Sequence, residues 1–237
     1  LVYDFPKNES RVSWGALSPG AEGVAPTMRR TRPHLRAEIG DHAVALLIDT
    51  GSTAGLSLRR LDRLPAESEP RRTGMRARVD GIHVIHSVRL TEDVALGPVV
   101  LERPIVRDAV RTNLVGQGVL KEFEVTFDQR RRLVRFERPA APVDEPLHSP
   151  SWYGIGAGFG FEDDDLEVVW VDPGSPAAVA GLRTGDRIQR LNGAATVSRG
   201  CDRWTIDNRD GPQSMVLTVR RGDELVELAV ETDVLVP

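Results

Sequence analysis

The sequence has few of the residues that build disulfides, metal centres or membrane spans. Its 237 residues include one cysteine, Cys201, which excludes an intrachain disulfide and a cysteine-rich metal site. Aromatic residues make up only 5%, and the longest apolar run, residues 43–48, is far shorter than the roughly 20 residues that cross a bilayer. Neither sign of charge dominates, because 31 basic residues stand against 35 acidic ones. We therefore expect no membrane span in this chain and no nucleic-acid partner.

What is present is a globular composition, with 40% hydrophobic and 28% charged residues, divided by proline and glycine. Residues 1–33 read as a strand end followed by a linker. Residues 34–138 contain short alternating or apolar stretches between Gly and Asp, which predicts a mostly β domain. Four prolines mark a second linker at 139–150. Residues 151–237 have the size of a small separate domain with both strands and helix.

Several local elements can be placed from their residues. A strand is expected over 99–106 and a hairpin turn over 221–224. Ser175 followed by Pro176 predicts a helix over 176–180, since serine caps helices and proline suits their first position. A second helix is expected around 198–208.

The two ends of the first 138 residues show a weak similarity. Residues 2–6 and 11–14 resemble residues 125–128 and 132–136: strand, Asp turn, basic residue, strand. The first copy is either the tail of an earlier repeat of the middle domain or simply a second hairpin with an Asp turn. Residue 1 is leucine and no signal-like segment follows it, so we expect a processed or truncated piece.

The sharpest chemical signal is the segment of residues 46–52, Leu-Leu-Ile-Asp-Thr-Gly-Ser. A buried strand that delivers Asp49 into a Thr-Gly turn places a carboxylate at the edge of a core, where backbone N–H groups can reach its oxygens. Sixty-four residues later come Asn113-Leu114-Val115-Gly116-Gln117 and a Phe-x-Val-x-Phe-Asp strand at 123–128. In this order the motifs resemble the retropepsin-like aspartic proteases of bacteria.

This resemblance implies a fold and a set of roles. The lobe would be a closed β barrel with a flap hairpin. Asp49 would be the catalytic carboxylate, Thr50 would lock two Asp loops together, and Gly51 would offer its N–H to the carboxylate. The flap over the substrate would have its tip at Asp80, Gly81 and Ile82, and Gly116 would lie under the active site with Leu114 and Val115.

The mechanism implied by this resemblance needs two carboxylates. Two like charges about 3 Å apart cannot both ionise, so such a pair shares one proton: one member activates water and the other hydrogen-bonds the peptide carbonyl. The chain contains Asp-Thr-Gly once. Either two copies associate, each supplying Asp49, or a preceding lobe carries its own aspartate and residues 1–14 are that lobe's last hairpin.

The C-terminal part carries a longer motif, Val171 to Ile188 (VDPGSPAAVAGLRTGDRI), followed by Leu-Asn-Gly at 191–193. It resembles a bacterial PDZ domain, which implies a small α/β fold that binds peptide tails. The carboxylate-binding loop of such a domain is expected at Gly158, Phe159, Gly160 and Phe161, with residues 153–156 as the alternative. The same glycines lack the strand-before, helix-after context of a dinucleotide site.

Other candidates are weaker. His83 and His86 fall on opposite faces of a predicted strand, which is poor geometry for a joint metal ligand. Asp163, Asp164 and Asp165 lack the glycine and the later glutamate of a calcium loop. Cys201 has no recognisable catalytic partners. No metal and no cofactor are expected.

The sequence thus predicts a mainly β aspartic endopeptidase lobe followed by a PDZ module that binds or regulates. Its partners would be a protein or peptide substrate, peptide C-termini and a second lobe or a homodimer mate. The alternatives are a non-catalytic peptide-binding scaffold and an inactive half of a two-lobed protease. Resemblance alone suggests a bacterial protein outside the cytoplasm.

Overall fold

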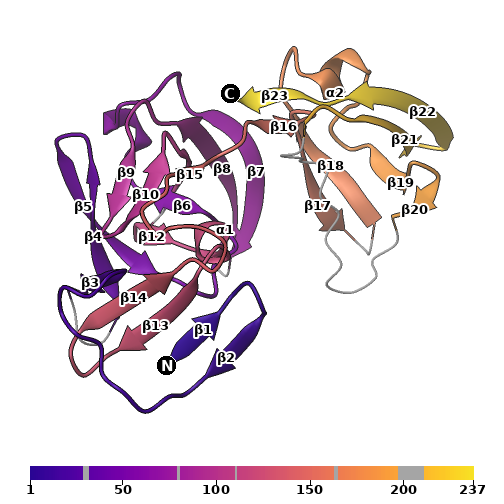
Figure 1. Ribbon diagram of the computed structural model, residues 1–237. Helices are drawn as coiled ribbons and strands as arrows, with labels where there is room; N and C mark the ends of the chain where they lie inside the picture. The colour runs from indigo at the N-terminus through magenta and orange to yellow at the C-terminus, as the bar shows by residue number, and fades with distance from the viewer. Residues whose placement is uncertain (29–31, 79–80, 110, 163–164, 197–210) are drawn as a thin grey trace. The chain divides into compact units, whose positions relative to one another are not determined.

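The computed structural model describes residues 1–28, 32–78, 81–109, 111–162, 165–196 and 211–237 (Figure 1). Contacts divide the chain into two units, one of residues 1–70 and 88–149 and one of residues 71–87 and 150–237. Each unit is described by itself below. Within the described residues we find no helix with the length and apolar character needed to cross a membrane.

Among the described residues, the largest sheet has ten strands. Their order across the sheet is β15 (Leu147–His148), β10 (Val99–Glu102), β9 (Val94–Leu96), β4 (His34–Ile39), β5 (His42–Ile48), β12 (Leu114–Val115), β6 (Leu56–Leu58), β11 (Ile105–Asp108), β8 (Gly81–Arg89) and β7 (Arg71–Arg78). A short 3-10 helix, η1 (Leu61–Arg63), and the helix α1 (Gln117–Leu120) interrupt the strands.

Alternation of apolar and charged residues fixes which face of this sheet is buried. In β4, Leu35, Ala37 and Ile39 are buried while Arg36 and Glu38 are exposed, as period-two strands require. The mainly β class predicted from the sequence is therefore confirmed. The sheet differs from the prediction in one respect, because in the described pairings it runs from β15 to β7 without closing, and so is a curled open sheet rather than a closed barrel.

The strand expected over residues 99–106 is two strands, β10 and β11. Between them Arg103 takes a φ of 34°, and Pro104 has no N–H to give to a ladder. The backbone N–H of Arg103 donates to Asp93 Oδ1 at 3.0 Å. A proline inside an apolar run was the signal for this break.

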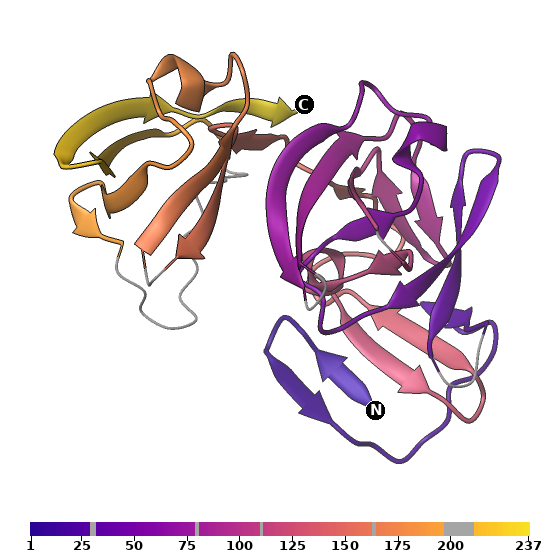
Figure 2. The ribbon, with the colours of Figure 1, turned by 180° about the vertical axis from the view of Figure 1, so that it is seen from behind.

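A second sheet gathers both ends of the first unit. Its order is β2 (Glu9–Arg11), β1 (Val2–Asp4), β13 (Glu124–Asp128), β14 (Leu133–Glu137) and β3 (Val24–Pro26). Seen from behind in Figure 2, the indigo β1–β2 hairpin lies beside the pink β13–β14 hairpin. The predicted linker thus contains a strand, since β3 pairs with β14.

The first core takes residues from both of these sheets. It includes Leu35, Ile48 and Val115 from the large sheet, and Phe123 and Phe136, whose rings meet edge to face at 5.6 Å between centroids. All five are almost fully buried. This core fixes the end of β5, and with it the position of the next residue, Asp49.

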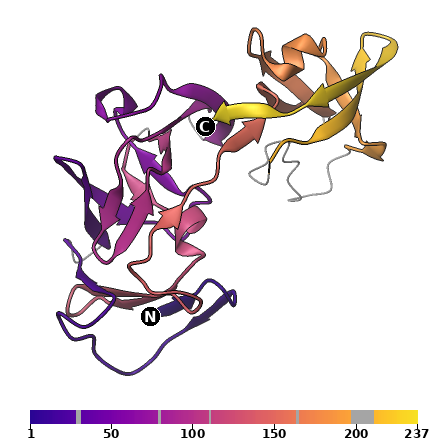
Figure 3. The same ribbon diagram turned by 45° about the horizontal axis from the view of Figure 1, so that its top comes forward.

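The second unit contains a six-stranded sheet and a two-stranded one (orange to yellow in Figure 3). The larger has the order β17 (Ala157–Glu162), β18 (Asp165–Val171), β19 (Arg187–Leu191), β21 (Ser214–Arg221) and β22 (Glu224–Glu231), with β20 (Ala194–Ala195) on β19; the smaller pairs β16 (Trp152–Gly154) with β23 (Asp233–Val236).

The 71–87 hairpin groups with this second unit. The Arg72 guanidinium carbon lies 4.9 Å from the centroid of the Trp170 ring, and Arg72 Nη1 is 3.8 Å from Asp172 Oδ1. Trp170 is buried but stands outside the apolar core of this unit, which is built from residues such as Val168, Ile188 and Leu217. Arg72 therefore helps to cover Trp170.

Two local predictions in this unit are confirmed. The helix α2 (Pro176–Val179) begins at Ser175, whose Oγ accepts the Ala178 N–H at 3.3 Å. The hairpin turn joins β21 to β22, with Arg221 opposite Glu224 and Gly222 at a φ of 60°. The helix expected around 198–208 lies outside the described residues.

Candidate functional site

The predicted catalytic residue, Asp49, directly follows the last buried residue of β5. Its backbone N–H donates to the Val115 carbonyl at 2.9 Å, and its carboxylate Oδ1 accepts the Gly51 N–H at 3.1 Å. The Ser52 N–H closes the turn on the Asp49 carbonyl at 3.2 Å. The side chain is partly exposed, so a fixed carboxylate is presented to solvent at the end of a rigid strand.

The strand β12 threads between the two arms of this turn. It pairs in parallel with β5, Val115 opposite Ile48, and antiparallel with β6, Val115 opposite Leu56. A two-residue strand held on both edges lets a chain segment 64 residues away brace the turn. This brings Asp49, Thr50, Gly51 and Gly116 together, as the motif order predicted.

Close backbone contact explains why glycine follows β12. A Cβ on Gly116 would stand 2.5 Å from the Ala54 carbonyl oxygen and 2.6 Å from the Ser52 carbonyl oxygen. A Cβ on Gly118 would stand 2.7 Å from the Gly55 nitrogen. The backbone approaches that closely because Gly116 and Gly118 donate their N–H groups to the carbonyls of Gly55 and Ala54 at 2.8 and 3.0 Å.

Gln117 is a site residue that sequence reasoning did not assign a role. Its side-chain Nε2 donates to the Thr50 carbonyl at 2.7 Å, and its backbone N–H donates to the Ser52 carbonyl at 2.7 Å. Gln117 therefore fastens both ends of the Thr-Gly turn to the start of α1. Its place directly after the glycine of the second motif was the available signal.

The predicted flap residues have different places. The strands β7 and β8 form a hairpin with Arg78 opposite Gly81, so a hairpin exists where the Asp-Gly pair predicted one. Gly81 and Ile82 begin β8, and Asp80 lies outside the described residues. Because residues 71–87 group with the second unit, the structure does not join them to Asp49 in one unit.

In the second unit, Gly158, Phe159, Gly160 and Phe161 lie inside β17. They form a strand and not a loop, because each pairs with β18, Gly158 opposite Trp170 and Gly160 opposite Glu167. The expectation of a loop at these residues is thus wrong. Within the described pairings β17 pairs with one strand, β18, while β7 lies against β17 without pairing with it.

The loop in this region is the connection from β16 to β17, Ile155 and Gly156. Its carbonyls accept the N–H groups of Ala177 and Asp172 at 2.9 and 2.8 Å, which ties it to the start of α2. Gly156 has a φ of 70°, and a Cβ there would stand 2.4 Å from Ser175 Cβ. Of the alternative position, residues 153–156, Ile155 and Gly156 form this loop, whereas Tyr153 and Gly154 belong to β16.

The second unit contains a buried ion pair between Asp186 and Arg221. Asp186 is 2% exposed and receives Arg221 Nε at 2.8 Å and Nη2 at 2.7 Å, together with the Arg183 N–H at 2.9 Å. Burial raises the pKa of Asp186, but these hydrogen bonds outweigh it and the pKa lies below its ordinary value. Arg221 also donates to the Gly181 carbonyl.

Among the residues that the structure describes, the candidate metal ligands form no centre. In the part of the chain that the structure describes, no group of three or more His, Cys, Asp or Glu side chains is placed to hold a metal ion. His83 and His86 lie on β8. Cys201, Asp163 and Asp164 lie outside the described residues.

The chain is similar to the crystal structure of a retropepsin-like aspartic protease from Rickettsia conorii, with 16% identity and a TM-score of 0.36, over 48% of this chain and 97% of that one. It is also similar to an HtrA-type protease, AlgW, solved with a decapeptide, with 13% identity and a TM-score of 0.30, over 85% of this chain and 72% of that one. Both of those proteins are proteases. No curated protein matches the sequence.

One family model matches the sequence itself. It is the model described as PDZ domain, and it spans residues 154–232. That range runs from the end of β16 through α2 and β22, and it includes the motif of residues 171–188. The C-terminal part of this chain is a PDZ domain.

Proposed function

We propose that this chain is the Asp49-bearing lobe of an aspartic endopeptidase, with a PDZ domain that binds peptide. In the proposed reaction Asp49 and a second carboxylate share one proton. The ionised member takes a proton from water as the water attacks the peptide carbonyl, while the protonated member hydrogen-bonds the carbonyl oxygen. Collapse of the tetrahedral intermediate, with a proton passed to the amine, releases the two peptides.

The observation that carries this proposal is the way Asp49 is held. A carboxylate at the end of a buried strand, braced by a parallel segment and oriented by the Gly51 N–H, keeps one geometry while staying accessible to water. An Asp in an ordinary surface turn needs none of this support. Thr50 stands in the same turn, where its hydroxyl would join the two Asp loops.

The remaining assignments follow from the same proposal. Asp80, Gly81 and Ile82 would contact substrate from the hairpin tip, and Gly116 would support the turn from below. In the PDZ domain, the edge of β17 that does not pair with β18 would take an extended peptide as an added strand, with Gly158 to Phe161 along it and the 155–156 loop at the peptide's carboxylate. The strand β7, which lies against β17, would have to leave room for that peptide.

The test replaces Asp49 by Asn in the natural full-length protein and compares cleavage of a mixed peptide library, read by mass spectrometry. Loss of one acid–base group is expected to lower turnover by about 10²–10⁴-fold. A statine-type transition-state mimic should inhibit the unchanged protein. As a matched control, Asp62→Asn, in η1, should leave turnover as it was. Unchanged cleavage in Asp49→Asn would rule out this site.

A second measurement separates the enzyme from a peptide-binding scaffold. A peptide with a free apolar C-terminus should raise the hydrogen-exchange protection of the β17 amides. Peptide binding without any cleavage, under conditions where the second carboxylate is supplied, would favour the scaffold.

A further inference from the structure

The β1–β2 hairpin is a structural copy of β13–β14. β1 ends at Asp4 and β13 ends at Asp128, and after each aspartate four turn residues lead into the next strand, at Glu9 and at Leu133. Any residue of the first hairpin thus corresponds to the residue 124 positions later.

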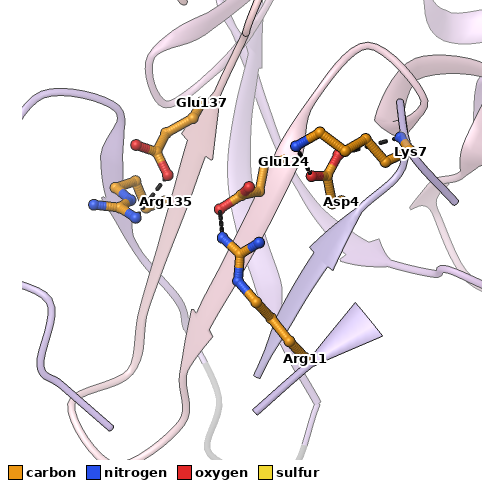
Figure 4. Close-up of polar contacts among 6 residues, drawn as sticks. All are labelled: Asp4, Lys7, Arg11, Glu124, Arg135 and Glu137. Atoms are coloured by element: carbon orange, nitrogen blue, oxygen red, sulfur yellow. Dashed lines mark hydrogen bonds and ion pairs between the residues drawn. The ribbon is translucent and has the colours of Figure 1, made fainter. Parts of the chain in front are cut away.

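The two turns agree in their hydrogen bonds and dihedral angles. Asp4 accepts the Lys7 N–H at 3.2 Å and Lys7 Nζ at 2.7 Å, and Asp128 accepts the Arg131 N–H at 2.9 Å and Arg131 Nη1 at 3.3 Å. The next residue, Asn8 or Arg132, has a φ of 55° or 59°. Figure 4 shows the Asp4–Lys7 pair beside the strand that carries Glu124. The two turns thus have an aspartate at the same position, the same hydrogen bonds to it and a residue with a left-handed backbone at the same place, so chance similarity is a poor explanation.

The two hairpins also pair with each other symmetrically. Val2 lies opposite Thr126, and Thr126 is the residue that corresponds to Val2 in the second hairpin. Tyr3 lies opposite Val125, which corresponds to Leu1. On the other side, Leu1 and Phe127 exchange N–H to carbonyl hydrogen bonds of 3.2 and 2.7 Å. Every antiparallel pair has a local two-fold axis, but here the axis between Val2 and Thr126 relates equivalent residues.

Only one of the two copies is covered. Phe136 is 3% exposed because it packs on Phe123 in the core, whereas its counterpart, Val12, is 81% exposed. Val125 is fully buried, whereas its counterpart, Leu1, is 42% exposed. Phe5 packs at the margin of the first core and Tyr3 contacts the Phe127 ring, but among the described residues nothing covers Val12, and Leu1 is only partly covered.

We propose that the face of β1–β2 that carries Leu1, Tyr3 and Val12 packs on a second lobe of the same fold in the same polypeptide, for which β1–β2 is the closing hairpin. The packing itself does not depend on the proposed function. Only its consequence does, which is that the second lobe would supply the second carboxylate. The local two-fold axis also places a counterpart of β3 on the outer edge of β2, which has no partner strand within the described pairings.

A second copy of the chain does not fit this place. A homodimer about the same axis needs the partner's β13 beside β13, but β1 already fills that edge and β14 fills the other. A copy could enter only by displacing β1, together with its ladder and the Arg11–Glu124 ion pair of 2.8 Å that Figure 4 shows.

The test builds the missing lobe from this chain. Glu124 precedes Val125, the counterpart of Leu1, so a copy of residues 24–124 is fused directly ahead of Leu1 in the full chain. In this tandem chain Val12→Asp should lower the unfolding midpoint by roughly 5 °C or more, because a charge would enter the new core. In the 237-residue chain the same substitution should leave the midpoint unchanged.

The control is Ser13→Asp, because Ser13 is exposed and its counterpart, Glu137, is an exposed acid. It should be neutral in both chains. A Val12→Asp midpoint equal to that of the unsubstituted tandem chain would overturn the proposal. Sedimentation of the 237-residue chain is a check that needs no tandem: a monomer is expected, and a homodimer with β1 still paired to β13 would also overturn it.

Measuring cleavage by the tandem chain distinguishes failure of this inference from failure of the proposed function. Cleavage by the tandem chain that is lost with Asp49→Asn in either lobe supports the enzyme. A tandem chain that responds to Val12→Asp but cleaves nothing and binds no statine mimic would retain the second lobe and refute the endopeptidase.

Discussion

At the scale of single residues, the clearest energetic feature is the pair of Asp186 and Arg221. A buried carboxylate with two hydrogen bonds from one guanidinium is stable only while it is ionised, because the bonds come from groups that can only donate. The glycine-rich motif places Asp186 but says nothing about Arg221, which is 35 residues away. That partner could be identified only from the folded sheet.

We predict that Asp186→Asn lowers the free energy of unfolding of the PDZ domain by about 2 kcal/mol at pH 7. The folded pKa of Asp186 is below the unfolded value of about 3.9, so the stabilisation is fully present above that value and is lost as pH falls through the folded pKa. The difference in free energy of unfolding between the two proteins should therefore shrink as pH falls below about 3.9, as read by urea titrations. Asp223→Asn, in the exposed turn before β22, is the matched control and should stay within about 0.5 kcal/mol at every pH. A constant gap across the pH range would contradict this account.

At the scale of elements, the turn at Asp49 depends on the chain that passes beneath it. We predict that Gly116→Ala destabilises the first unit by about 1–3 kcal/mol, because the new methyl group would meet two backbone carbonyls that cannot rotate away. Chemical denaturation checks this. Gly15→Ala is the control, since nothing lies within 4 Å of a Cβ there. Equal stability of the two variants would show that β12 can shift without cost.

The same scale shows what could be predicted from sequence. The order of the two motifs was enough to bring Asp49 and Gly116 together, and the Ser175-Pro176 pair was enough to begin α2. Glycines were less informative, because Gly156 and Gly158 look alike in sequence. Only the left-handed φ of Gly156, against the extended strand at Gly158, separates loop from strand. The break at Pro104 was missed because the apolar pattern continues through it.

At the scale of the whole molecule, the buried apolar residues that the structure describes form two cores that share no residue. The composition and the prolines indicated a division, but they gave no sign that residues 71–87 would group with the C-terminal unit. That grouping depends on contacts such as Arg72 on Trp170, which join residues far apart in sequence. Long-range contacts of this kind have no local sequence signal.

Separate cores predict separate unfolding transitions. Phe123→Ala removes a fully buried ring from the first core and should cost about 3–5 kcal/mol, while Leu217→Ala should cost about 2–5 kcal/mol in the second. Trp152 and Trp170 are buried in the second unit, whereas Trp14 of the first unit is fully exposed. The fourth tryptophan, Trp204, belongs to the second unit but lies outside the described residues, so tryptophan fluorescence should report mainly the second unit. We expect Leu217→Ala to lower the midpoint of the fluorescence transition. Phe123→Ala should leave that midpoint unchanged and should lower only the midpoint of the circular dichroism transition that belongs to the first unit. If Phe123→Ala shifts the fluorescence midpoint as far as Leu217→Ala does, the two units unfold as one.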